Sequence, residues 1–188
     1  MNSKMNTKNL KFLATLSIAA LLAPAIITAC AGAPTQELAA PVAVAEPAHI
    51  HANLESRSNS KVTGTVHIEP AGDQILVQYH IKGLTKGTKH GFHIHAKGDC
   101  SSPDAESAGG HWNPGNAPHG APGSAAHHPG DFGNITADKK GEAKGELRVA
   151  AFKLSDAKGL AVIIHGKADD LKSQPSGNAG PRVACGVL

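Results

Sequence analysis

Alternation of apolar and polar residues at a period of two is the feature that most constrains what this chain can fold into. Residues 62–68 alternate in this way, residues 70–73 (Pro-Ala-Gly-Asp) are typical of a turn, and residues 75–81 resume the alternation. The same period recurs in residues 91–95, 133–137, 145–152 and 160–165, and no segment has a helical repeat of useful length. We therefore predict an all-β sandwich or barrel.

Two long segments, residues 96–129 and 166–181, fit no strand. Loops of this length in a compact domain are usually functional or disordered. Seven of the 12 histidines lie between His90 and His128. His93 and His95 stand two apart on a predicted strand, so their side chains leave the same face. Two histidines at this spacing most often lie on the protein surface and bind no metal. The residues around them decide between this reading and a metal site.

Several spaced motifs, in this order, resemble the copper/zinc superoxide dismutases over residues 60–188. They are Gly-Phe-His-Ile-His at 91–95, Gly-Asp-Cys at 98–100, Gly-His-Trp-Asn-Pro at 110–114, Gly-Asp-Phe-Gly-Asn at 130–134, His165 with Lys-Ala-Asp-Asp at 167–170, and the segment 177–186. The resemblance implies an eight-stranded, immunoglobulin-like Greek-key β-sandwich with two long functional loops.

The resemblance also implies one copper and one zinc ion per subunit. The implied copper ligands are His93, His95, His111 and His165, and the implied zinc ligands are His111, His119, His128 and Asp131. The family's ligand intervals favour His128 over His127. His67, His80 and His127 are expected to be exposed, and His90 to form structural hydrogen bonds.

Further roles follow from the same resemblance. Asp169 would link His93 to His119, Cys100 and Cys185 would form a disulfide, and Arg182 would line the route of the substrate to copper. The implied reaction is dismutation of superoxide to dioxygen and hydrogen peroxide, with His111 and Arg182 as the catalytic residues. The alternative is a non-catalytic copper/zinc carrier or buffer of the same fold, which would lack a ligand or Arg182.

The N-terminal segment predicts export. Residues 1–29 contain three lysines and no acidic residue, and residues 12–29 are uncharged and mostly apolar, which is typical of a signal peptide; a transmembrane helix is the alternative. Residues 27–30 resemble the bacterial lipoprotein motif, so we expect a lipid on Cys30; ordinary cleavage is the other option. Because Ala31 follows, we expect a periplasmic protein anchored to the outer membrane.

These predictions divide the chain into a signal peptide (1–29), an Ala/Pro-rich lipid-anchored tether (30–52) and the metal-binding domain (53–188). His49 and His51, at the end of the tether, are either a solvated pair or a metal-chelating pair that assists copper loading. The formal charge of +3 comes from 18 basic and 15 acidic residues, so the three signal-peptide lysines account for all of it. With only 3% aromatic residues, no nucleic-acid partner is expected, and a homodimer is left open.

Overall fold

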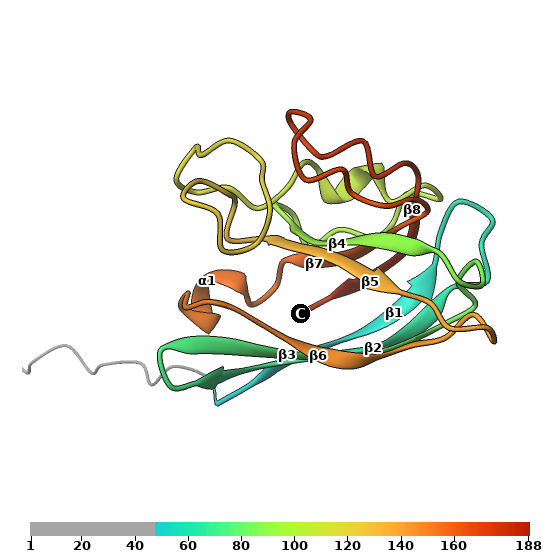
Figure 1. The fold of residues 1–188 in the computed structure, drawn as a ribbon, viewed down its shortest axis with the longest axis horizontal. Coiled ribbons are helices and arrows are strands. Elements are labelled where there is room, and N and C mark those ends of the chain that lie inside the picture. Colours follow the sequence, from blue (N-terminus) through green and yellow to red (C-terminus); the bar gives the residue numbers. More distant parts are fainter. Residues whose placement is uncertain (1–47) are drawn as a thin grey trace, which may run out of the picture. The chain divides into compact units, whose positions relative to one another are not determined.

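The computed structural model describes residues 48–188, which form a β-sandwich (Figure 1). The predictions for the signal peptide, Cys30 and most of the tether lie outside the described residues. The strands are β1 (Ile50–Ser56), β2 (Thr63–Ala71), β3 (Gln74–Lys82), β4 (Lys89–His95), β5 (Asp131–Thr136), β6 (Ala143–Ala150), β7 (Ala161–His165) and β8 (Arg182–Val187). The helices in this part of the chain are a 3₁₀ turn, η1 (Glu106–Ala108), and α1 (Leu154–Ala157); neither is long enough to cross a membrane.

The strands are antiparallel and follow the order β5-β4-β7-β8-β1-β2-β3-β6. One sheet holds β1, β2, β3 and β6, the other holds β4, β5, β7 and β8, and β1 pairs with both β2 and β8. The chain crosses between the sheets after β3, after β5 and again after β6, which gives a Greek-key arrangement (Figure 1). The predicted all-β fold is confirmed.

The core lies between the two sheets and consists of the inward-facing residues of each strand. On β2 and β3 these include Val66, Ile68 and Val77, each fully buried. Phe92 of β4 meets them from the other sheet, with its ring 5.1 Å from that of Phe132 in an edge-to-face contact. Side chains alternate across a strand, so with Phe92 and Ile94 directed into the core, His93 and His95 point to the outer side of the sheet.

The folded part begins earlier than the sequence suggests. β1 starts at Ile50, three residues before the predicted start of the domain at residue 53, because Ile50, Ala52 and Leu54 all point into the core. β2 also continues through Pro70 and Ala71, so the turn to β3 is shorter than predicted.

The two long loops lie on the outer side of the sheet that contains β4 and β7 (Figure 1). The first connects β4 to β5 and carries η1, and the second connects β7 to β8. They cover that face of β4, which is why His93 and His95 are buried although they point away from the core between the sheets. This covered face is the place where the histidines collect.

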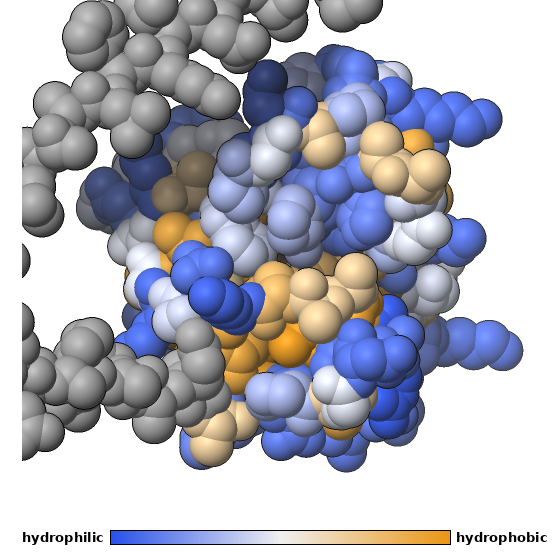
Figure 2. Space-filling view, turned by 90° about the vertical axis from the view of Figure 1, so that its left-hand side faces the viewer, coloured by the Kyte–Doolittle hydropathy of each residue, from blue (hydrophilic) through white to orange (hydrophobic). Residues whose placement is uncertain are grey.

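A second feature of the surface is an apolar area near α1, ringed by polar side chains (Figure 2). Shallow hollows in this region are lined by Val149, Phe152 and Leu154, and Phe152 packs edge-on against Trp112 at 5.2 Å. This packing joins the end of β6 to the loop that carries Trp112.

The disulfide predicted from the resemblance is present. Cys100, in the first long loop, is bonded to Cys185 of β8, 85 residues away in the sequence. The loop is fixed further by Arg57, whose Nε donates to the carbonyl of Cys100 at 2.8 Å. The bond therefore holds η1 and the loop around it against β8.

Replacing both cysteines with alanine is expected to lower the free energy of unfolding by about 2–5 kcal/mol, because a closed loop of this size restricts the unfolded chain. Guanidinium unfolding of the two proteins measures the difference. A thiol reductant serves as the control, since it should lower the stability of the parent and leave that of the variant unchanged. Equal stability of parent and variant would contradict the prediction.

Candidate metal centre

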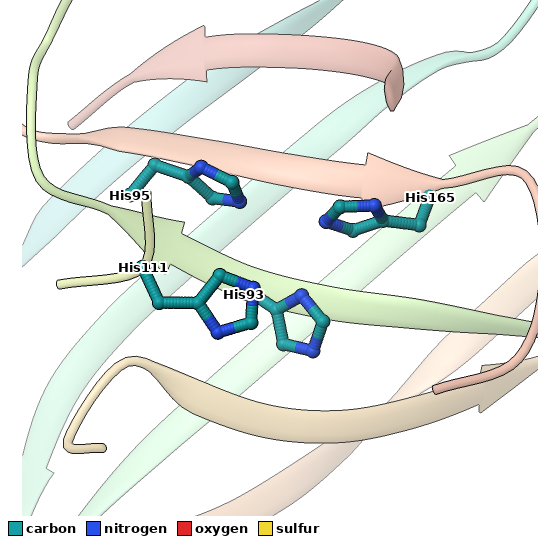
Figure 3. Close-up of side chains that lie close together, drawn as sticks. All are labelled: His93, His95, His111 and His165. Atoms are coloured by element: carbon teal, nitrogen blue, oxygen red, sulfur yellow. The ribbon is translucent and has the colours of Figure 1, made fainter. Parts of the chain in front are cut away.

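Four histidines from three segments converge on one point beneath the long loops. His93 and His95 come from β4, His165 ends β7, and His111 is joined to His95 by an isolated β-bridge. Figure 3 shows the four rings facing a common space. One ring nitrogen from each residue lies within 4.8 Å of all the others. We call this set the four-histidine cluster.

In each ring of the four-histidine cluster, one nitrogen has a partner and the other has none. His93 Nε2 donates to Asp169 Oδ2 at 2.8 Å, and His95 Nδ1 donates to the Gly109 carbonyl at 2.8 Å. His165 Nδ1 lies 3.2 Å from the carbonyl of Gly180. The unpartnered nitrogens are those that face the centre of the cluster, namely His93 Nδ1, His95 Nε2, His111 Nε2 and His165 Nε2.

Buried polar atoms without a protein partner are rare and costly, so four of them aimed at one point indicate a ligand-binding site. The hydrogen bonds on the opposite nitrogens set the ring tautomers so that lone pairs face inward, as in histidines that bind metals. Four imidazole nitrogens are a suitable donor set for copper. The residues therefore fit the copper ion that the sequence predicts.

A second cluster shares His111 and consists of His111, His119, His128 and Asp131. Asp131 Oδ1 lies 2.7 Å from His111 Nδ1 and 3.1 Å from His128 Nδ1, while His119 Nδ1 lies 3.0 Å from Oδ2. The Nδ1 atoms of His111 and His128 are 3.4 Å apart. Neighbouring nitrogens of a tetrahedral zinc site stand about 3.3 Å apart, given bonds of about 2.0–2.1 Å. This mixed nitrogen and carboxylate set fits zinc.

The electrostatics of both clusters favour the protonation states that metal ligands need. Burial holds the pKa of His93 and that of His95 well below the usual value, and neighbouring imidazoles lower both further. Burial lowers the pKa of His165 to about 4. Burial alone would raise the pKa of Asp131, but hydrogen bonds from His111 Nδ1 and the His128 amide hold it far below its ordinary value. At neutral pH these three imidazoles are neutral and this carboxylate is charged.

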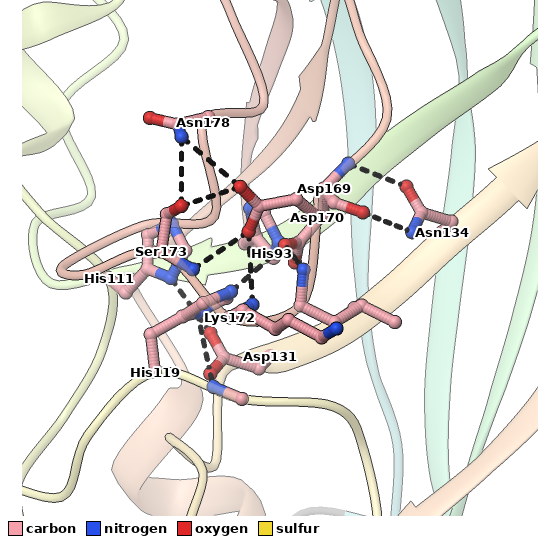
Figure 4. A network of polar contacts seen from close by, with 12 residues as sticks. His93, His111, His119, Asp131, Asn134, Asp169, Asp170, Lys172, Ser173 and Asn178 are labelled. Carbon is pink, nitrogen blue, oxygen red and sulfur yellow. Dashed lines mark hydrogen bonds and ion pairs between the residues drawn. The ribbon is translucent and has the colours of Figure 1, made fainter.

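Asp169 connects the two clusters. Its Oδ2 accepts from His93 Nε2 at 2.8 Å and its Oδ1 accepts from His119 Nε2 at 2.9 Å (Figure 4). Asn134 fixes the backbone of Asp169 on both sides, donating to its carbonyl at 2.9 Å and accepting from its amide at 2.8 Å. Gly177, with φ of +68°, covers the contact; a Cβ there would overlap the carboxylate. Asp169 thus orients one ring in each cluster.

Arg182, the first residue of β8, lies beside the four-histidine cluster. Its Nη1 donates to the Ala105 carbonyl at 2.7 Å, and its Nη2 is 3.2 Å from Glu106 Oε2. A cavity of about 270 Å³ is lined by His95, His111, His165, Glu106 and Arg182, among others. A small anion that enters this cavity passes the fixed positive charge of Arg182 before it reaches the histidines.

A larger, more open hollow of about 410 Å³ lies on the outer face of β2, β3 and β6, away from both clusters.

The other histidines lie outside these clusters. His127 Nδ1 lies 3.0 Å from the Ser124 carbonyl, so His128 is the one of the two that the structure brings into the second cluster. His67 is exposed, whereas His80 and His127 are half-buried. His90 is buried and hydrogen-bonded through Nδ1 to the carbonyl of His165 at 2.8 Å, as its expected structural role requires.

Two residues that hold the backbone of the site were not predicted from the sequence. Asn134 lies in the motif at residues 130–134, so the sequence did carry a signal for it. Gln174 has no such signal: its Oε1 accepts from the amide of His119 at 2.8 Å and its Nε2 donates to the carbonyl of the same residue at 2.9 Å. Gln174 thereby fixes the backbone of His119 from the second long loop.

Comparison with known proteins agrees with this geometry. The family model for copper/zinc superoxide dismutase (SODC) matches residues 62–188. A superoxide dismutase [Cu-Zn] of Yarrowia lipolytica is 42% identical over 143 residues, which cover 70% of this chain and 92% of that protein. Superoxide dismutase [Cu-Zn] 1 of Aquifex aeolicus is 34% identical, covering 77% of this chain and 90% of its own length.

Among solved structures, one titled as the crystal structure analysis of the clock protein EA4 matches with a TM-score of 0.69 and 34% identity. The match covers 77% of this chain and 95% of that one.

Proposed function

Because the chain belongs to the copper/zinc superoxide dismutase family, we propose that it is an enzyme that converts two superoxide anions and two protons into dioxygen and hydrogen peroxide. The observation that carries this proposal is the set of four unpartnered nitrogens in the four-histidine cluster, of which three belong to residues that line a cavity beside Arg182. The cluster suits copper, and the second cluster suits zinc.

Copper, when bound, supplies the electron chemistry, because Cu(II) and Cu(I) both accept imidazole ligands and the ion can take an electron from one superoxide and give it to the next. The chain's residues provide position and charge. The Arg182 guanidinium attracts the anion into the cavity and offers it N–H donors next to the unpartnered nitrogens. The long loops exclude bulk water from the buried rings.

His111 is the residue for proton transfer, because it belongs to both clusters. Its Nδ1 lies against Asp131 and His128, whereas its Nε2 has no partner and lines the cavity. A proton held at His111 Nε2 is placed to be given to the reduced substrate as it becomes peroxide. Asp131, kept charged, holds the ring in this orientation.

A superoxide decay assay on the copper- and zinc-loaded chain, paired with metal analysis, tests the proposal. The expected result is one copper and one zinc per chain and fast, catalytic decay. A chain that holds both metals and leaves superoxide decay unchanged would support the non-catalytic carrier instead. That carrier is not favoured, because Arg182 and every expected ligand position are occupied by the expected residues.

We also propose that the enzyme acts in the periplasm, anchored to the outer membrane through lipid on Cys30. The uncharged segment 12–29 followed directly by a cysteine supports this proposal.

Replacing Cys30 with serine is expected to move the protein from the membrane fraction to the soluble fraction, because the anchor would be lost. Fractionation of cells that express the parent and the variant measures this. The double alanine variant at Cys100 and Cys185 is the control, since it also removes cysteines but keeps Cys30, and it should stay on the membrane. Membrane association of the serine variant equal to that of the parent would reject the anchor.

A further inference from the structure

A third group of histidines lies on the outer face of the other sheet and has no part in the proposed reaction. His51 of β1 is paired directly with His67 of β2 in the strand register. His49 stands two residues before His51, so the two side chains leave the same face of the chain. All three histidines are exposed. The sequence placed His49 and His51 together, and the strand pairing adds His67.

The His67 ring lies close to each of the other two rings. The centroid of the His67 ring lies 5.5 Å from that of His51, with the planes nearly parallel, and 6.0 Å from that of His49. In the four-histidine cluster of the same structure, ring centroids are separated by 4.1 Å to 6.4 Å. The two ring contacts of His67 are therefore as short as those between rings that converge on one ion. As exposed side chains, they can rotate about χ1 and χ2 to aim a nitrogen each at a common point.

The surroundings suit a cation. Glu69 is exposed and lies two positions beyond His67 on the same face of β2, so it adds a carboxylate beside the rings. Each of the three histidines lies on or next to a paired strand, which fixes the backbone positions from which the rings project. The strand pairing thus reduces the conformational entropy that binding must overcome.

We propose that His49, His51 and His67 form a surface site for a divalent first-row transition metal, with Cu(II) bound most tightly. Imidazole is a good ligand for Cu, Zn and Ni, and affinity in this series is highest for Cu(II). The site is separate from the two buried clusters and shares no residue with them. It holds an additional ion on the opposite sheet from the proposed catalytic centre.

Equilibrium dialysis against Cu(II) tests this on the full chain already loaded with one copper and one zinc. The parent should bind one further copper ion per chain. His67→Gln should weaken that binding by about tenfold or more, because it removes the ligand between the other two. The copper and zinc already bound and the rate of superoxide decay should stay as in the parent. The electron paramagnetic resonance signal that appears with the added Cu(II) should show nitrogen ligands in the parent.

His80→Gln is the matched control. His80 lies on β3 of the same sheet and its Nε2 is 3.4 Å from Glu142, so its loss removes an imidazole without touching the group. This variant should bind the additional copper as the parent does. The proposal is overturned if the loaded parent binds no additional copper, if His67→Gln binds it as tightly as the parent, or if His80→Gln loses it equally.

Discussion

His165→Ala is expected to reduce copper binding and superoxide decay on the order of a hundredfold while leaving zinc bound. His165 Nε2 is one of the four unpartnered nitrogens, so alanine removes a quarter of the proposed copper donors. His165 does not belong to the second cluster, whose contacts run through Asp131. Metal analysis after dialysis and a decay assay on the same samples measure both effects.

The matched control for this variant is His127→Ala. His127 is next to the proposed zinc ligand His128, but its Nδ1 faces the Ser124 carbonyl, so the variant should keep both metals and the parent rate. Equal loss of copper and zinc in His165→Ala would contradict the division of the histidines between the two clusters. So would a loss of zinc in His127→Ala as large as that expected for a ligand.

Arg182→Ala is expected to slow superoxide decay by about 10- to 100-fold with both metals retained. Electrostatic steering, of which this enzyme family is an established example, changes association rates by about 10- to 1,000-fold. Arg182 supplies the positive charge of the cavity wall, and the acidic residue among those that line the cavity is Glu106, 67% exposed. The rate of the variant should also depend less on salt, because screening has a smaller attraction to weaken.

Stopped-flow decay at several ionic strengths compares Arg182→Ala with Arg148→Ala, which removes the same charge from an exposed position on β6. Arg148→Ala should keep nearly the parent rate, because its position is far from the cavity lining. Arg182→Lys should recover part of the rate, since lysine restores the charge without the planar donor geometry. Similar losses in both alanine variants would show that net charge, and not the local position of Arg182, governs the rate.

The fold could be predicted from the sequence where a strand buries one face and exposes the other. β2 and β3 are of this kind, with Val66 and Val77 inward and polar residues outward. β1 was missed because small Ala52 supplies little hydrophobic signal and an Ala/Pro-rich segment precedes it. What defines β1 is its pairing with β2 and β8, a long-range contact that no local pattern reports.

The metal ligands of the candidate site could be predicted, because few residue types bind copper or zinc. The histidines and Asp131 carry spaced motifs, so their grouping could be foreseen from a resemblance. The hydrogen bonds that orient the rings could not be foreseen. Two of them are accepted by the backbone carbonyls of Gly109 and Gly180, and because every residue has a backbone carbonyl, the sequence carries no signal for them. Gln174 reaches His119 across 55 residues of sequence, and only the folded loops show it.

The most direct test of the central claim is the rate of superoxide decay measured against copper occupancy, with the zinc content held at one ion per chain. The rate should rise in proportion to copper and be absent when the four-histidine cluster is empty. A rate that stays constant as copper is removed, or that follows zinc instead, would contradict the claim.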